Sequence, residues 1–206
     1  MGKHLLGMRD GKLQVLGVVG SLNQNSVTRV VVQHVAEALR RQGCEVDIFD
    51  PVKEQLGLFN PDSSYTGAGF AALQARVEAA DVLILGTPDY HGSISSTLKN
   101  FLDHFWQEFA GKLFASIVAS HEKGLTVTDQ LRTVARQCYA WSMPYGVSFN
   151  EREDLKEGVV SSEQLKKRLE MLVHDICNYG TVIAEQRLRD LNNNTPGFLA
   201  RYRAKR

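Results

Sequence analysis

The segment at residues 20–26 carries residue types that can bind a phosphate. It reads Gly-Ser-Leu-Asn-Gln-Asn-Ser and directly follows an apolar run. Gly20 permits a tight turn and a close approach of the backbone. If a helix follows Ser26, its first N–H groups are free and lie at the positive end of the helix dipole. Such groups can bind a phosphate together with side-chain donors. The candidate donors are Ser21, Asn23, Asn25, Ser26 and Thr28.

The segment at residues 87–93 carries residue types suited to a flat ring. It reads Thr-Pro-Asp-Tyr-His-Gly-Ser and also follows an apolar run. Pro88 stiffens the turn. Tyr90 and His91 can lie beside a ring, and Gly92 lets the backbone approach it. We expect no catalytic role for His91, because a loop histidine is more commonly a hydrogen-bonded residue. Each segment also has an alternative interpretation without a ligand. Residues 20–26 could be an ordinary polar turn with a serine cap, and residues 87–93 a surface turn with a structural tyrosine.

The elements that position these segments alternate between short apolar runs and longer amphipathic stretches. The run Val82-Leu83-Ile84-Leu85 is apolar without interruption, which is typical of a strand buried on both faces of a parallel sheet. Strands are expected at residues 13–19, 45–49, 81–86, 113–119 and 143–149. Helices are expected at 27–42, at 70–80, from Ser95 or Ser96 to about 109, from Thr128 or Asp129 through 138, and at 162–191.

Five such units predict an α/β fold, a flavodoxin-like three-layer sandwich. Right-handed crossovers favour a five-stranded parallel sheet in the order 2-1-3-4-5. The order reverses between the first and third strands, and ligands bind at the carboxyl ends of strands at such a point. The two polar segments follow these two strands. Together they predict a mononucleotide with an aromatic head group, for which flavin is the obvious candidate.

Composition and length predict a single domain, residues 1–206, with flexible tails at 1–12 and 192–206. The net charge of +1 does not indicate a surface that binds nucleic acid or an anionic membrane. No apolar run approaches the roughly 18–20 residues that span a bilayer. The first residues lack the pattern of a signal peptide. We therefore expect a cytoplasmic protein with no nucleic-acid or membrane partner.

The cysteines and histidines predict neither a disulfide framework nor a metal site. Cys44, Cys138 and Cys177 lie far apart in the sequence, and their odd number fits no closed framework, so we expect buried or half-buried thiols. His121-Glu122 resembles the start of a zinc-binding helix motif, but Leu125 stands where the second histidine belongs.

Two further segments have more than one interpretation. The loop at residues 120–124 could reach the far edge of a bound ring, or be a solvated charged turn. The expected third helix carries an aromatic stripe, Phe101, Phe105, Trp106 and Phe109, that we expect to face the core or a partner subunit. A direct contact of Trp106 with flavin is the less favoured alternative.

These residues make the chain similar to the NADPH-dependent FMN reductase family, which includes azoreductase- and chromate-reductase-like quinone reductases. The resemblance is carried by Gly20-Ser21-Leu22 with Ser26 and Arg29, and by residues 58–62, 87–93 and 98–103. It covers roughly the first 120 residues. The spacing of the paired loops is specific, whereas either loop alone is not.

The resemblance implies a flavodoxin-like fold with noncovalently bound FMN. NADPH or NADH would give hydride to the flavin N5, and a small-molecule acceptor such as a quinone, flavin, azo compound or metal oxyanion would take the electrons. No side chain need act as nucleophile or base. A homodimer or homotetramer is implied, with residues 58–62 and the third helix near its interface. The implied phosphate site is Ser21, Asn23 and Ser26 with nearby backbone such as Val27 and Thr28, and the implied ring site is Pro88, Asp89, Tyr90, His91 and Gly92.

Three positions depart from the family's pattern. Asn23 stands where arginine is frequent, and Arg29 is a candidate to supply the missing charge. Asp89 stands where glutamate is frequent, and the polar loop at 120–124 replaces a glycine-rich one.

Two other functions are alternatives. A flavodoxin-like electron carrier without direct NAD(P)H activity is disfavoured mildly by the near-neutral charge. A hydrolase using Ser21 or Ser93 is disfavoured because neither serine stands in a GxSxG elbow.

Overall fold

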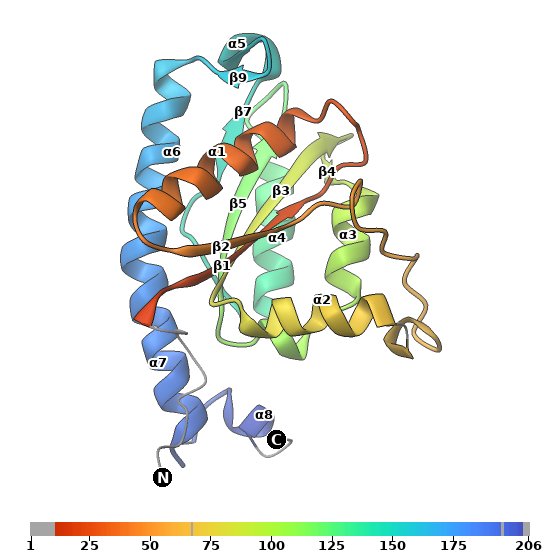
Figure 1. The fold of residues 1–206 in the computed structure, drawn as a ribbon, viewed down its shortest axis with the longest axis vertical. Coiled ribbons are helices and arrows are strands. Elements are labelled where there is room, and N and C mark those ends of the chain that lie inside the picture. Colours follow the sequence, from red (N-terminus) through yellow and green to blue (C-terminus); the bar gives the residue numbers. More distant parts are fainter. Residues whose placement is uncertain (1–10, 67, 195, 204–206) are drawn as a thin grey trace.

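A seven-stranded sheet covered by helices on both faces forms the body of the protein (Figure 1). The computed structural model describes residues 11–66, 68–194 and 196–203. The sheet contains β1 (Gln14–Val19), β2 (Glu45–Phe49), β3 (Val82–Tyr90), β4 (Ser93–Ile94), β5 (Leu113–Ala119), β6 (Trp141–Ser142) and β7 (Val147–Phe149). The order is β2-β1-β3-β5-β6, with β4 paired to β3 and β7 paired to β5. The predicted flavodoxin-like order is therefore confirmed for the principal strands, which pair in parallel.

The helices divide between the two faces of the sheet. The structure contains α1 (Val27–Arg41), α2 (Ala68–Ala79), α3 (Ser96–Asp103), α4 (Leu125–Gln137), α5 (Glu151–Asp154), α6 (Glu163–Asp175), α7 (Thr181–Asn192) and α8 (Ala200–Arg203). Short turns of 3-10 helix lie at Ser64–Thr66 and Gln107–Phe109, and a π-helical turn at Ile176–Gly180 joins α6 to α7. A small hairpin, β8 (Leu155–Lys156) and β9 (Val159–Val160), precedes α6.

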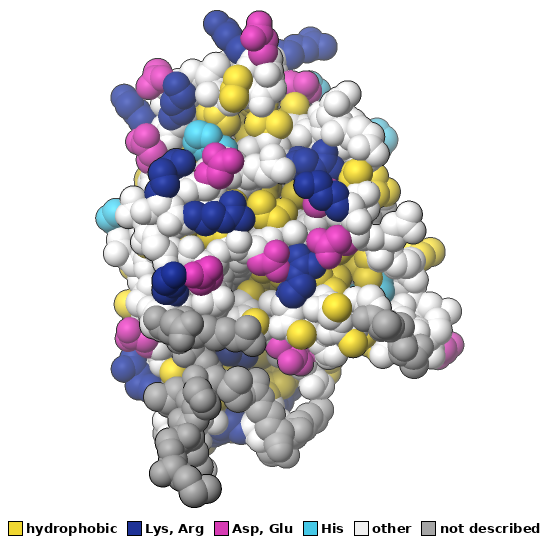
Figure 2. Space-filling view, viewed as in Figure 1, with side chains coloured by type: hydrophobic (Ala, Val, Ile, Leu, Met, Phe, Trp, Pro, Cys, Tyr) yellow, Lys and Arg dark blue, Asp and Glu magenta, His cyan; other side chains and the backbone are white. Residues whose placement is uncertain are grey.

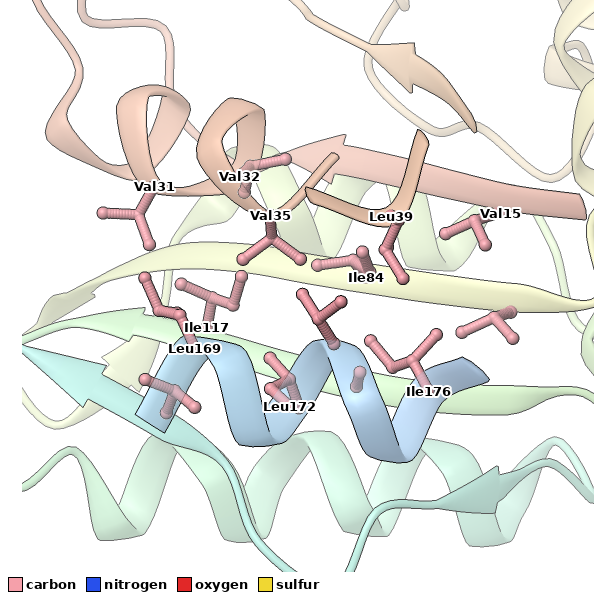
Figure 3. Packing of buried hydrophobic residues seen from close by; sticks show 14 of the residues in the cluster. Val15, Val31, Val32, Val35, Leu39, Ile84, Ile117, Leu169, Leu172 and Ile176 are labelled. Atoms are coloured by element: carbon pink, nitrogen blue, oxygen red, sulfur yellow. The ribbon is translucent and has the colours of Figure 1, made fainter. Parts of the chain in front are cut away.

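Alternation along the strands builds two apolar layers. Val15 and Ile84 face α1 and α6, whereas Leu16 and Leu83 face α2, α3 and α4. In the first layer the side chains of α1 and α6 meet over the sheet (Figure 3). Burial on both faces explains why the strands read as continuous apolar runs. This double core fixes the carboxyl ends of β1, β3 and β5 side by side.

The boundaries of several elements differ from the predictions. The third strand continues through Tyr90 instead of ending at residue 86, because it pairs with β4 and along β5. The helix expected to begin at Thr128 or Asp129 begins at Leu125, after Gly124 in a left-handed conformation. The expected third helix ends at Asp103, and a 3-10 turn follows. The predicted fifth strand is split into β6 and β7.

Part of the segment expected to be a loose tail is packed. After α7, the short helix α8 contributes Tyr202 to a small buried cluster with Leu199 and Ala110. The expected flexible segment at 1–12 lies mostly outside the described residues. Trp106 is half exposed and does not face the core, unlike Phe101, Phe105 and Phe109.

The surface shows no single-sign charge patch on the face in Figure 2, where basic and acidic side chains are interspersed. Among the helices of the described residues, none combines the length and apolar character needed to cross a membrane. The same described residues contain no cluster of side chains able to hold a metal ion.

Candidate functional site

The segment after β1 is held tightly against β3. The amide of Gly20 donates to the carbonyl of Gly86 (2.8 Å), and the Ser95 hydroxyl donates to the carbonyl of Gly20 (2.6 Å). A Cβ at position 20 would lie 2.6 Å from the Gly86 carbonyl oxygen and 2.7 Å from the Leu98 Cβ. Only glycine fits this position, and the close approach sets the start of the loop beside the end of β3.

The same loop is shaped by its own polar side chains. The Ser21 Oγ accepts from the amide of Asn23 (3.3 Å), and the Asn23 Oδ1 accepts from the amide of Asn25 (2.9 Å). Ser26 caps α1, since its Oγ accepts from the amide of Arg29 (3.3 Å). The hydroxyl hydrogens and the other first-turn amides of α1 remain as donors for an anion. Asn23 and Asn25 therefore organise the loop as well as bordering the site.

Arg29 does not supply the free positive charge that the sequence suggested. Its Nε and Nη2 donate to the two carboxylate oxygens of Asp50 at 2.7 and 3.1 Å. The two side chains are 12% and 4% exposed. Burial opposes ionisation of Asp50, but the hydrogen bond from Arg29 and the amide of Val52 together hold the pKa of Asp50 below its ordinary value. The charge of Arg29 is neutralised within the protein.

The segment at 87–93 is a strand end and a tight hairpin. Pro88 lies within β3, opposite Ala119 of β5, and Tyr90 pairs with Ser93 of β4. His91 and Gly92 have positive φ angles of 57° and 74°. Positive φ at both central residues is typical of a type I′ turn, which matches the twist of a hairpin. The Tyr90 side chain projects from this turn and is 57% exposed.

Asp89 connects this hairpin to the loop after β5. Its Oδ1 accepts from the amide of Gly92 (2.8 Å), and its Oδ2 accepts from the Ser120 hydroxyl (2.9 Å). Ser120 in turn accepts from the amide of Glu122 (3.1 Å). One carboxylate therefore fixes the separation of the two loops.

Two adjoining hollows lie where these loops meet. The smaller, about 200 Å³, is lined by the loop after β1, the end of β3, the loop after β5 and Glu151. The larger, about 740 Å³, is lined by the hairpin turn and the residues from Ser120 into α4. Both are lined by Asp89, Ser120 and His121, so they share a wall.

The structure brings most of the predicted site residues together. Gly92 lines the larger hollow, whereas His91 lines neither and belongs to the turn. The predicted residues around the smaller hollow are Ser21, Asn23, Ser26, Val27, Thr28, Pro88, Asp89 and Tyr90.

Several lining residues received no firm role from the sequence, among them Ser120, His121 and Glu151. Ser120 and His121 stand in the loop that had two interpretations, and the structure puts it beside both hollows. Glu151 begins α5, and nothing in its local sequence signals a site. The Ser120 amide donates to the carbonyl of Phe149, the last residue of β7 (2.9 Å), so its position depends on a tertiary contact that the sequence does not signal.

The chemistry of these donors fits FMN. The smaller hollow offers hydroxyls and helix-start amides, which suit a phosphate. The larger hollow has open space beside Gly92, where an added Cβ would meet only the Thr126 Oγ1 at 3.6 Å. This space suits a flat ring. Among the described residues, no lysine or arginine lines the smaller hollow.

The family model for NADPH-dependent FMN reductases matches residues 13–154. The chain belongs to this family, and the family's cofactor is FMN. It is similar to the FMN-dependent NADPH-azoreductase of Staphylococcus aureus, with 29% identity over 166 residues. That similarity covers 74% of this chain and 88% of the relative.

Solved structures support the same fold. A NADH:FMN oxidoreductase in its apo form superposes with a TM-score of 0.67 at 16% identity, covering 83% of this chain and 89% of the other. The NAD(P)H:(acceptor) oxidoreductase FerB of Paracoccus denitrificans gives 0.64 at 20% identity, covering 84% and 98%. A flavodoxin of Streptococcus pneumonia TIGR4 gives 0.55 at 17% identity, covering 81% and 98%. At these identities the likeness concerns the fold alone.

Proposed function

We propose that the chain is an FMN-dependent NAD(P)H oxidoreductase that passes electrons to a small-molecule acceptor at the two hollows. Membership of the family supports the cofactor and the reaction type. The observation that carries the location is the convergence of three loops on one edge of the sheet. Two of them, the hairpin and the loop after β5, are joined by the Asp89–Ser120 hydrogen bond.

In this proposal the loop after β1 binds the FMN phosphate. The hydroxyls of Ser21, Ser26 and Thr28 donate to it, and so do the first-turn amides of Val27 and Thr28. The positive end of the α1 dipole favours the anion. Asn23 keeps the loop in shape through its contact with Asn25.

The ring would lie between the hairpin and the loop after β5. On the hairpin side, Asp89 and Gly92 line the larger hollow, and Gly92 leaves space for the ring. Pro88 and Tyr90 line the adjoining smaller hollow, next to the shared wall at Asp89. His91 serves the turn through its backbone conformation. When bound, FMN supplies the hydride chemistry between NADPH or NADH and the acceptor, and the protein supplies position and electrostatics.

The nature of the acceptor and the assembly remain predictions. The relative's name points to azo compounds, and quinones, free flavin and metal oxyanions are the other predicted classes. A homodimer or homotetramer is expected, and Leu58, 88% exposed beside the loop after β1, is a side chain that a second subunit could cover. A cytoplasmic location is likewise expected.

An anaerobic reduction tests the proposal. NADPH and, separately, NADH are added to the purified holoprotein under anaerobic conditions, and the flavin absorbance is followed. We expect bleaching of the oxidised spectrum by at least one of the two donors. Persistence of the oxidised spectrum with both, together with rapid reduction by a partner flavoprotein, would instead favour the electron-carrier alternative.

A further inference from the structure

The charged side chain of Arg29 lies near the proposed phosphate site but does not line it. Arg29 stands in the first turn of α1, where a cation is well placed to reach an anion at the helix start. Its guanidinium instead contacts Asp50, which follows β2, and the backbone of the loop after β1. Neither Arg29 nor Asp50 lines the smaller hollow.

We infer that Arg29 is a positioning residue that holds the phosphate-binding loop in shape, and that the FMN phosphate is bound by uncharged donors. The inference rests on the proposed function of this site. Arg29 and Asp50 then help to select the phosphorylated cofactor without contacting the phosphate themselves.

The hydrogen bonds of Arg29 leave it little capacity for a ligand. A guanidinium has five N–H donors. Nε and one Nη2 hydrogen serve Asp50, and Nη1 donates to the carbonyls of Asn23 (2.9 Å) and Gln24 (3.0 Å). Four of the five donors are therefore used, and the one that remains cannot form a bidentate clamp on a phosphate.

The two carbonyl contacts act on the shape of the loop. In a trans peptide the C=O and the following N–H point in opposite directions. Fixing the Asn23 carbonyl on Arg29 therefore turns the amide of Gln24 away from the guanidinium, and it keeps two carbonyl oxygens occupied that would otherwise repel an anion. The backbone amide of Arg29 also donates to Ser26, so one residue links the loop to the cap of α1.

The charge of the pair explains the need for Asp50. A buried guanidinium without a partner is costly, and the carboxylate compensates it. A lysine could not replace Arg29, because its single ammonium lacks the planar fork that reaches a carboxylate and two carbonyls at once.

The test compares FMN with riboflavin, which lacks the phosphate. Both are titrated into the full-chain apoprotein and followed by flavin fluorescence. The variants are Arg29→Lys, Asp50→Asn and a double variant that combines Arg29→Met with Asp50→Asn. The double variant removes the buried pair without leaving a lone charge. We expect FMN affinity to fall roughly ten- to hundred-fold, the range typical when a residue that orients a binding group is removed, while riboflavin affinity stays unchanged.

A matched control is Arg76→Met. Arg76 also makes a bidentate contact with an aspartate, Asp47, and donates to a backbone carbonyl, that of Ile48 (3.0 Å), but it lies away from the loop after β1. We expect this variant to bind both flavins as the wild type does. For the wild type, we expect FMN affinity to change less than about threefold with added salt, because no exposed ion pair holds the phosphate.

Three outcomes would overturn the inference. In the first, the variants lose affinity for FMN and riboflavin equally. In the second, the FMN affinity of the variants is unchanged. In the third, added salt strongly lowers the FMN affinity of the wild type and Asp50→Asn binds FMN more tightly. The last would mean that Arg29 contacts the phosphate directly. A wild-type chain that binds neither flavin would contradict the proposed function itself, which separates the two failures.

Discussion

Replacing Ser21 by aspartate places a negative charge in the proposed phosphate site. Ser21 is 6% exposed and lines the smaller hollow beside Ser26 and Thr28. A carboxylate there would lie against the phosphate and in the position of a hydroxyl donor. We expect Ser21→Asp to be purified largely without FMN.

The size of the effect follows from Coulomb's law. Two unit charges about 4 Å apart repel by about 1 kcal/mol in bulk water and about 4 kcal/mol at an effective dielectric constant near 20. These limits correspond to an FMN dissociation constant raised roughly 5-fold to 1000-fold. Because both buried residues, such as Ser21 and Ser26, and the exposed Tyr90 line the hollow, we expect a value between these limits.

The assay is a fluorescence titration of the apoprotein with FMN and with riboflavin. Ser21→Asn is the matched control, since its amide is uncharged and its oxygen can still accept from the Asn23 amide. Riboflavin affinity should be equal in both variants. An FMN dissociation constant of Ser21→Asp no higher than that of Ser21→Asn would refute the assignment of the phosphate to this loop.

Three other predictions concern stability and reactivity. Gly20→Ala should lower the free energy of unfolding by about 1–3 kcal/mol, because the added Cβ overlaps the Gly86 carbonyl; an unchanged urea midpoint would contradict this. Because the pKa of Asp50 is lowered in the folded state, its ionised carboxylate stabilises the protein above the ordinary carboxyl pKa, and this stabilisation is lost as the pH falls through the lowered pKa. In a plot of the urea midpoint against pH, Asp50→Asn should therefore show a smaller fall on the acid side than the wild type. Burial and the Cys177 thiol, 3.8 Å away, raise the pKa of Cys44 to about 12, so iodoacetamide at about pH 8 should label Cys44 only after denaturation; labelling of the native protein at the denatured rate would exclude this environment.

The arrangement of the fold was predictable because local patterns carry it. The uninterrupted run at Val82-Leu83-Ile84-Leu85 indicated a doubly covered parallel strand, and the structure buries all four side chains. Turn residues such as Gly20 and caps such as Ser26 indicated the edge of the sheet where the candidate site lies. These signals depend on near neighbours in the chain, so one sequence suffices to recognise them.

The ends of elements were less predictable because partners elsewhere set them. β3 continues to Tyr90 since Pro88 and its neighbours pair along β5 and with β4. The start of α4 at Leu125 follows from the left-handed Gly124, which a search for a serine, threonine or aspartate cap does not consider.

Contacts between distant segments could not be read from the sequence. Arg29 looked like a free cation, but Asp50 follows a different strand and neutralises it. Cys44 and Cys177, expected as separate thiols, are in contact because the π-helical turn packs against the start of β2.

The sequence alone determined the alternation of strands and helices, the two candidate ligand-binding segments and the family to which the chain belongs, since each depends on residue types at short spacing. The tertiary structure decided which charges are free to act. It paired Arg29 with Asp50 and joined the hairpin to the loop after β5 through Asp89 and Ser120. Only the folded chain brings these groups within hydrogen-bond distance, because their separation in space is set by the packing of whole elements.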